Sequence, residues 1–174
     1  RPVDFSFCRE AMAHVGQASS LPIELEGWKR APLRDPRTKL LVTQRLLHVR
    51  RRLSHLWAQG DYVPLEVSGL LADHIVAFGW RGAESQRIEL LAAVPRFVQK
   101  LIDAERASGT ENSTSQFPLP PGIWDGNFIV LPAGSNLSAT NVFTGQSHVL
   151  AEPAVAAGVL LADFPIGVLE TSPS

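Results

Sequence analysis

The chain has 174 residues, a hydrophobic fraction of 45%, a charged fraction of 19% and a formal net charge of -1. This length is enough for one domain, or for a small domain with an appendage, and the composition is that of an ordinary globular protein. No apolar run approaches the roughly 20 residues of a membrane-spanning helix, so we expect no membrane partner. The single Cys8 excludes an internal disulfide and fits a cytoplasmic protein. Because Arg1 is not preceded by Met, we expect a fragment or a processed product.

The charges are distributed unevenly along the chain. Residues 28–52 contain nine Lys or Arg and one acidic residue, whereas residues 53–174 contain five basic and twelve acidic residues. We expect the basic segment to meet the acidic half of the chain or another acidic surface. Nucleic-acid binding through the consecutive arginines 50–52 is the alternative. Those side chains would point about 100° apart on a helix and no stacking aromatics lie between them, so we expect no nucleic-acid partner.

The sequence before residue 35 predicts little regular structure. Asp4 is placed to cap a helix over residues 5–15, which Gly16 would end. A loop follows over residues 17–32. Its Trp28 is expected to fill the core, with stacking on a sugar as the alternative.

The longest predicted element is a helix over residues 35–60. Asp35 is a good N-cap, Pro36 suits the first helical position, and Gly60 suits a left-handed C-terminal residue. Its apolar residues recur every three or four positions and share one face: Val42, Leu46, Val49, Leu53 and Leu56, widened by Leu40, Leu41, Leu47 and Trp57. So broad an apolar face must pack on another layer.

After residue 60 the pattern changes to short strands. The predicted strands span residues 62–67, 73–80, 86–94, 126–131, 139–143, 146–150, 158–162 and 166–169, with a helix over 95–106 and a loop over 107–122. Thr144-Gly145 predicts a hairpin turn. About eight strands separated by turn residues are typical of an antiparallel sandwich or barrel. We predict that its core includes Val76, Phe78, Leu91, Ile129 and Leu160.

No self-sufficient active site is evident in the sequence. The five histidines (14, 48, 55, 74 and 148) lack the spacing of a helical metal pair and no CxxC occurs, so we expect no metal and no cofactor. Nucleophile and phosphate-binding motifs are also absent. Cys8 could act as a nucleophile only with a base beside it, and the sequence identifies none. Glu24 and Glu26 are close to each other in the sequence, but this alone does not make them an acid–base pair. The chain therefore suggests an accessory portion of a larger protein.

Several short motifs, in their order along the chain, resemble the maltooligosyl trehalose synthases of the α-amylase superfamily. They are RPVDF (1–5), DPRTKL (35–40), LLHVRR (46–51), GDYVPLEV (60–67), DHIVAF (73–78), AAVPRFV (92–98), FPLPPGIWDG (117–126), NVFTG (141–145) and LLADFPIGVL (160–169). The chain departs from the family pattern at residues 17–27. It also has no proline at residues 54–57, where relatives carry one before the last helical turn.

This resemblance implies an α+β chain with two parts. Residues 1–59 would be the tail of a catalytic (β/α)8 barrel, ending in its last outer helix, and residues 60–174 would be the β-sandwich that follows. The apolar helix face would pack on a barrel lying mostly outside this chain, and partly on the sandwich. The catalytic carboxylates would lie upstream, so no catalytic residue is predicted here. Arg1 and Asp4 are the candidate sugar-binding residues, although helix capping is the expected role of Asp4.

The resemblance also implies an activity for the parent enzyme. It would convert the reducing-end α-1,4 linkage of a maltooligosaccharide into an α,α-1,1 linkage through a covalent glucosyl–carboxylate intermediate, without a metal. This chain would reach that substrate only through the missing barrel and would be inactive alone. The alternative is a non-catalytic β-sandwich that binds α-glucan, with Trp80 or Trp124 as a stacking platform rather than as a core residue.

Overall fold

The computed structural model describes residues 36–107, 121–132, 137–150 and 153–172, together with the helical residues 6, 9 and 10. The expected sugar-binding residues Arg1 and Asp4 lie outside this part of the chain, as do Cys8 and Trp28. Most of the predicted helix over residues 5–15 also lies outside it.

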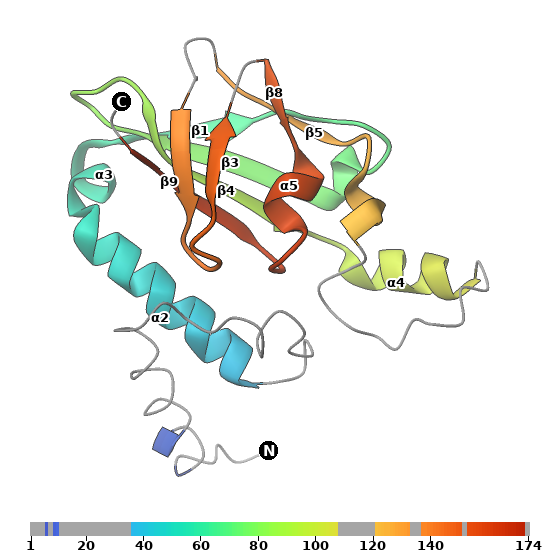
Figure 1. Cartoon of the computed structure of the whole chain (residues 1–174). Helices are drawn as coiled ribbons and strands as arrows, with labels where there is room; N and C mark the ends of the chain where they lie inside the picture. The colour runs from blue at the N-terminus through green and yellow to red at the C-terminus, as the bar shows by residue number, and fades with distance from the viewer. Residues whose placement is uncertain are drawn as a thin grey trace.

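The described chain combines helices with a larger amount of antiparallel sheet (Figure 1). The helices are α2 (Pro36–Arg52), α3 (Ser54–Gln59), α4 (Val98–Ala107) and α5 (Ala157–Leu161), with 3-10 turns η2 (Ala72–His74) and η3 (Pro121–Trp124). The strands are β1 (Asp61–Leu65), β2 (Val67–Ser68), β3 (Ile75–Arg81), β4 (Ile88–Pro95), β5 (Phe128–Val130), β6 (Leu137–Asn141), β7 (Ser147–Leu150), β8 (Ala154–Ala156) and β9 (Gly167–Ser172).

Two antiparallel sheets form the sandwich. The larger has the order β1-β3-β4-β9-β6-β7 and the smaller the order β2-β5-β8. Both sheets contribute to one buried cluster, in which Leu91 and Leu169 of the larger sheet join Ile129 and Val155 of the smaller. The prediction of an antiparallel sandwich is therefore confirmed.

The larger sheet is apolar on both faces. Its inner face meets the smaller sheet, and its outer face carries a second cluster that includes α2 and α3. Of the predicted core residues, Leu91, Ile129 and Leu160 are buried between the sheets. Val76 and Phe78 were wrongly placed in that core. They pair with Val94 and Ala92 and face outward, because alternate residues of a strand point to opposite faces.

The long predicted helix is two helices, α2 and α3, which meet at Leu53. Gly60 follows α3 in an extended conformation (φ -82°, ψ 162°), not in the predicted left-handed one. Glycine is needed there for another reason. A Cβ atom on Gly60 would lie 2.6 Å from the carbonyl oxygen of Leu56 and 2.8 Å from that of Arg81.

The last predicted strands need one correction. Residues 158–162, predicted as a strand, lie largely in helix α5, whose Ala157, Leu160 and Leu161 are buried at helical spacing. A short apolar run is compatible with either structure, and packing decides between them. The hairpin turn at Thr144-Gly145 is confirmed. Gly145 has φ 71°, and the Asn141 side-chain oxygen accepts the N–H groups of Phe143 and Thr144.

We predict that Phe164→Ala lowers the free energy of unfolding by about 3–5 kcal/mol. Phe164 is 1% exposed and stacks on Phe143 with a centroid distance of 4.5 Å and an interplanar angle of 14°. Its removal would leave a cavity beneath α2. Urea unfolding measures the effect, with Phe128→Ala as control because Phe128 is 42% exposed. Equal losses in the two variants would contradict this packing.

Candidate functional site

The candidate site lies on the outer face of the larger sheet, where α2 and α3 pack. Leu41 and Val49 of α2 and Leu56 of α3 are at most 2% exposed and pack against the sheet and the Phe143–Phe164 stack. Residues 36–59, which contain both helices, have no acidic residue, and α2 runs alongside the larger sheet (Figure 1). The larger sheet is thereby the middle layer of three.

An apolar groove runs between α2 and the part of the sheet that the helices leave uncovered. Its volume is about 640 Å³. Leu46 and Leu47 line one side and Phe78 and Val94 line the other, with Trp57 at the α3 end. Leu46 is 36% exposed and Leu47 is 57% exposed. The predicted broad apolar face of the helix is therefore divided: one side is buried on the sheet and the other side opens into this groove.

Four aromatic rings lie beside the groove. Trp57 of α3 packs edge-to-face on Trp80 of β3, with ring centroids 4.7 Å apart. Tyr62 of β1 contacts Trp80 edge-to-face at 5.9 Å and Phe78 at 5.4 Å. Tyr62, on an edge strand, is 53% exposed. Trp80 is crossed at 68° by Trp57 and at 78° by Tyr62, whereas Tyr62 and Phe78 are inclined by only 31°, so the four rings do not form one flat platform.

Two polar contacts fasten the helices to the sheet. Arg52, at the end of α2, donates through its Nε and Nη2 atoms to the two carboxylate oxygens of Glu170 on β9, and this hydrogen bonding raises the pKa of Arg52. His55 Nε2 of α3 lies 2.8 Å from Glu89 Oε2 on β4, and Ser85 donates to Glu89 Oε1. The predicted contact between the basic segment and the acidic half of the chain is thus observed in the ion pair of Arg52 with Glu170.

A polar cleft of about 580 Å³ lies on the other side of α2. Arg45, His48 and Arg52 line it from the helix, and Asn141 and Glu170 line it from the sheet. Burial lowers the pKa of Arg45. Because Arg52 and Glu170 already bind each other in this cleft, and Asn141 is engaged by the hairpin turn, the arrangement is that of a structural contact.

The tryptophans proposed as stacking platforms have different environments. Trp124 is 1% exposed and belongs to the core between the sheets, which excludes it as a platform. Trp80 is half-buried within the aromatic group described above. Tyr62 is the most exposed of these rings, but the sequence did not predict it as a surface aromatic. A signal was present: Pro64 favours an edge strand, and residues 62 and 64 of a strand share one face, so Tyr62 could have been placed on the exposed face of that edge.

The described residues hold no group of three or more His, Cys, Asp or Glu side chains that could bind a metal ion. None of the described helices is long and apolar enough to cross a membrane. The buried polar side chains Asn127 and Asn141 support the backbone instead. Asn127 accepts the N–H of Leu71 at 2.7 Å and donates to the carbonyl oxygens of Trp124 and Asp125.

Comparison with solved structures identifies the architecture. The structure of maltooligosyltrehalose synthase from Arthrobacter ramosus matches with a TM-score of 0.58 and 23% sequence identity, over 99% of this chain and 17% of that chain. A single-site mutant of the same enzyme matches with a TM-score of 0.59 and 24% identity, over the same shares. Comparison with family models and with curated sequences gives no match.

The chain has the fold of part of a maltooligosyltrehalose synthase. The resemblance predicted from the motifs is confirmed at the level of fold. The chain spans 17% of the length of these enzymes, so most of their chain has no counterpart here. Two of the motifs on which the resemblance was predicted have structural explanations. NVFTG supplies Asn141 and Phe143, and LLADFPIGVL supplies the stacked Phe164.

We predict that Glu89 stabilises the protein more at neutral than at acidic pH. Burial would raise its carboxyl pKa, but hydrogen bonds from Ser85 and His55 outweigh this and lower the pKa. A lowered folded-state pKa gives stability above the ordinary carboxyl value, which is lost as the pH falls through the folded-state value. At about pH 7, Glu89→Gln should lose at most about 1 kcal/mol, since the pair is near the surface.

That loss should shrink towards zero in urea unfolding as the pH is lowered through the folded-state pKa of Glu89, because the carboxyl group then becomes protonated. Glu84→Gln, at an exposed residue of the same hairpin, is the control and should show no such pH dependence. A difference between wild type and Glu89→Gln that grows on acidification would contradict the assignment.

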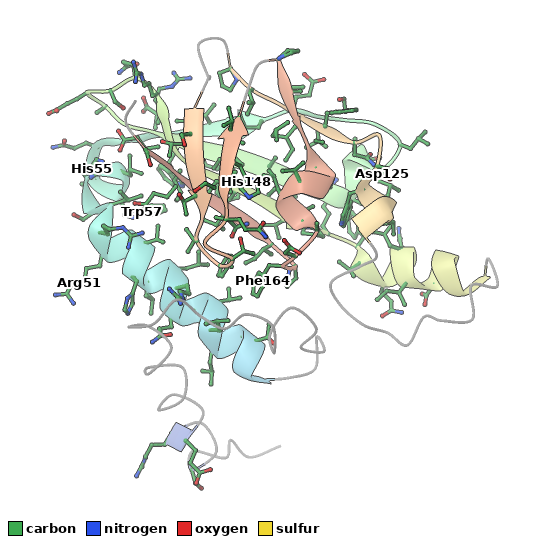
Figure 2. All side chains as sticks on the ribbon, viewed as in Figure 1. Arg51, His55, Trp57, Asp125, His148 and Phe164 are labelled. Atoms are coloured by element: carbon green, nitrogen blue, oxygen red, sulfur yellow. The ribbon has the colours of Figure 1, made fainter. Side chains whose placement is uncertain are left out.

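We also predict a measurable coupling between Arg52 and Glu170. A double-mutant cycle with Arg52→Ala and Glu170→Ala should give about 0.2–1 kcal/mol at low salt, decreasing as salt screens the partly exposed pair. The matched cycle with Arg51→Ala should give no coupling, because Arg51 extends from α2 away from the sheets (Figure 2). Equal coupling in the two cycles would show a general charge effect instead of this contact.

Proposed function

We propose that this chain is the C-terminal segment of a trehalose-forming intramolecular glucosyltransferase. In this proposal residues 1–59 are the end of a catalytic barrel and residues 60–174 are the sandwich that follows it. The single observation that supports it most is the match in fold over 99% of the chain to maltooligosyltrehalose synthase. The parent enzyme would work in the cytoplasm on a maltooligosaccharide.

The proposed reaction is an isomerisation in which no water is consumed. A barrel carboxylate would attack C1 of the glucosyl unit next to the reducing end and displace the reducing-end glucose. The anomeric hydroxyl of that glucose would then displace the carboxylate and form the α,α-1,1 linkage. The described residues offer no candidate for the carboxylate or for the general acid. Their proposed contribution is to hold the barrel end in place through α2 and the sheet.

The alternative, a self-standing α-glucan-binding sandwich, has less support. Glucan recognition needs an exposed, flat aromatic face with polar partners beside it. Trp124 is buried, and Trp57 and Tyr62 each cross the ring of Trp80 at a steep angle. The exposure of Tyr62 and its shallow angle of 31° to Phe78 favour this alternative.

The test is an assay with maltopentaose, following loss of reducing ends and formation of a non-reducing product. We expect the 174-residue chain to show no activity, and the longer polypeptide that contains it to form maltooligosyltrehalose. Calorimetric titration of the 174-residue chain with maltopentaose is the companion measurement, and we expect no binding. Conversion of maltopentaose by the 174-residue chain alone would contradict the proposal that the catalytic residues lie outside this chain. Binding that Tyr62→Ala abolishes would favour the glucan-binding alternative.

A further inference from the structure

We propose that the polar cleft between α2 and the strands β6 and β9 is a binding site for a small phosphorylated sugar of the size of a hexose monophosphate. Residues of α2 form one wall of this cleft, and residues of β6, β9 and the β6–β7 turn form the other. The proposed function gives the cleft no role as a binding site, and the inference does not depend on that function.

The first observation is the chemistry of the lining. The cleft has a volume of about 580 Å³, within the range of about 300–1,000 Å³ that is usual for ligand pockets. Val49 and Val142 are the two apolar side chains among the residues that line it. Small-molecule sites are concave and use convergent polar groups to fix the orientation of the ligand. The polar side chains here are Arg45, His48, Arg52, Thr140, Asn141, Glu170, Thr171 and Ser172.

The second observation is the charge of the cleft. Arg45, His48 and Arg52 are spaced by three and four residues, so they share one side of α2. Glu170 is the one carboxylate among the described residues that line the cleft. Burial lowers the pKa of Arg45, which shows that its guanidinium is partly removed from water. A charged donor in such surroundings binds an anion more strongly than the same donor in bulk water.

The third observation is that the ion pair of Arg52 with Glu170 fixes two polar groups in the cleft without using all of their hydrogen-bonding capacity. Arg52 donates through Nε and Nη2, whereas a guanidinium carries five N–H groups, so further donors remain. A carboxylate can accept about four hydrogen bonds, and Arg52 supplies two to Glu170. The contact that fastens α2 to the sheet therefore also holds a cation and an acceptor in place, which reduces the entropic cost of binding a ligand.

This combination favours a phosphorylated sugar over other small ligands. Arginine recognises phosphate through charge-assisted hydrogen bonds, which are often bidentate. The hydroxyl groups of Thr140 and Ser172 and the carboxylate of Glu170 can bind the hydroxyl groups of a sugar ring. A neutral glucan would be expected to stack on an aromatic side chain, and the described residues lining the cleft include none. Inorganic phosphate would leave the hydroxyl-bearing wall without a partner.

The test is a titration of the isotope-labelled 174-residue chain with glucose 6-phosphate, followed by two-dimensional NMR. We expect saturable shifts of amide signals in α2, β6 and β9. Arg45→Gln should weaken binding by about tenfold, as expected for the loss of a hydrogen bond between charged groups, and His48→Ala by about threefold. Arg51→Gln is the matched control and should leave the affinity unchanged, because Arg51 extends from α2 away from the sheets (Figure 2).

Glucose and inorganic phosphate are titrated in parallel, and each should bind at least about tenfold more weakly than glucose 6-phosphate, because each lacks one half of the proposed contacts. The amide spectrum of each variant shows whether it is folded. His48 is exposed, so its substitution gives a folded variant even if Arg45→Gln disturbs the packing of α2.

Three outcomes would overturn the proposal. One is the absence of saturable binding of glucose 6-phosphate. Another is equal weakening by His48→Ala, Arg45→Gln and Arg51→Gln, which would indicate a general charge effect. The third is equal affinity for glucose 6-phosphate and either glucose or inorganic phosphate, which would show that the cleft does not read both parts of the ligand. None of these readouts depends on the conversion of maltopentaose, so this proposal and the proposed function can fail separately.

Discussion

The packing of one helix on one sheet face is the constraint on which most of this structure depends. A six-stranded sheet that is apolar on both faces needs a cover on each. The smaller sheet covers one face, and Leu41, Val49 and Leu56 cover much of the other. Without α2 and α3, the stacked rings of Phe143 and Phe164 would be exposed to water. The helical and sheet parts of the chain therefore share a core, although they come from different regions of the sequence.

The motifs behind the family resemblance owe much of their pattern to this architecture. Asn141 in NVFTG accepts two backbone N–H groups in the β6–β7 turn, which sets the adjacent Phe143 against Phe164. Asn127, just after the IWDG motif, ties η3 to the backbone of Leu71. Buried amides with several backbone partners are costly to replace. Structural roles of this kind are enough for these motifs to identify the fold, and they are compatible with the proposal that the activity resides in another part of a longer polypeptide.

The sequence predicted the positions of several helices and turns well, but it predicted poorly which face of an element packs against which layer. Helical spacing located α2, and turn residues located the β6–β7 hairpin, because both signals are local. Val76 and Phe78 were assigned to the wrong face because β3 has apolar residues at both alternating sets of positions, and only the tertiary arrangement decides which layer each set meets. The break at Leu53 carries no glycine or proline. The groove was unpredictable for the same reason, since Leu47 and Val49 look alike until the sheet position is known.

The ion pair at the end of α2 shows how the basic segment can serve two surfaces. Three consecutive arginines point in different directions on a helix, so one sheet cannot engage them all. Glu170 binds Arg52, whereas Arg50 lines the groove and Arg51 points away from the sheets (Figure 2). If α2 only covered this sandwich, exposed apolar residues such as Leu46 and Leu47 on its outer side would not stabilise the fold. A helix between two bodies needs apolar residues towards both. We propose that α2 is such a helix, placed between the sandwich and the end of the proposed barrel.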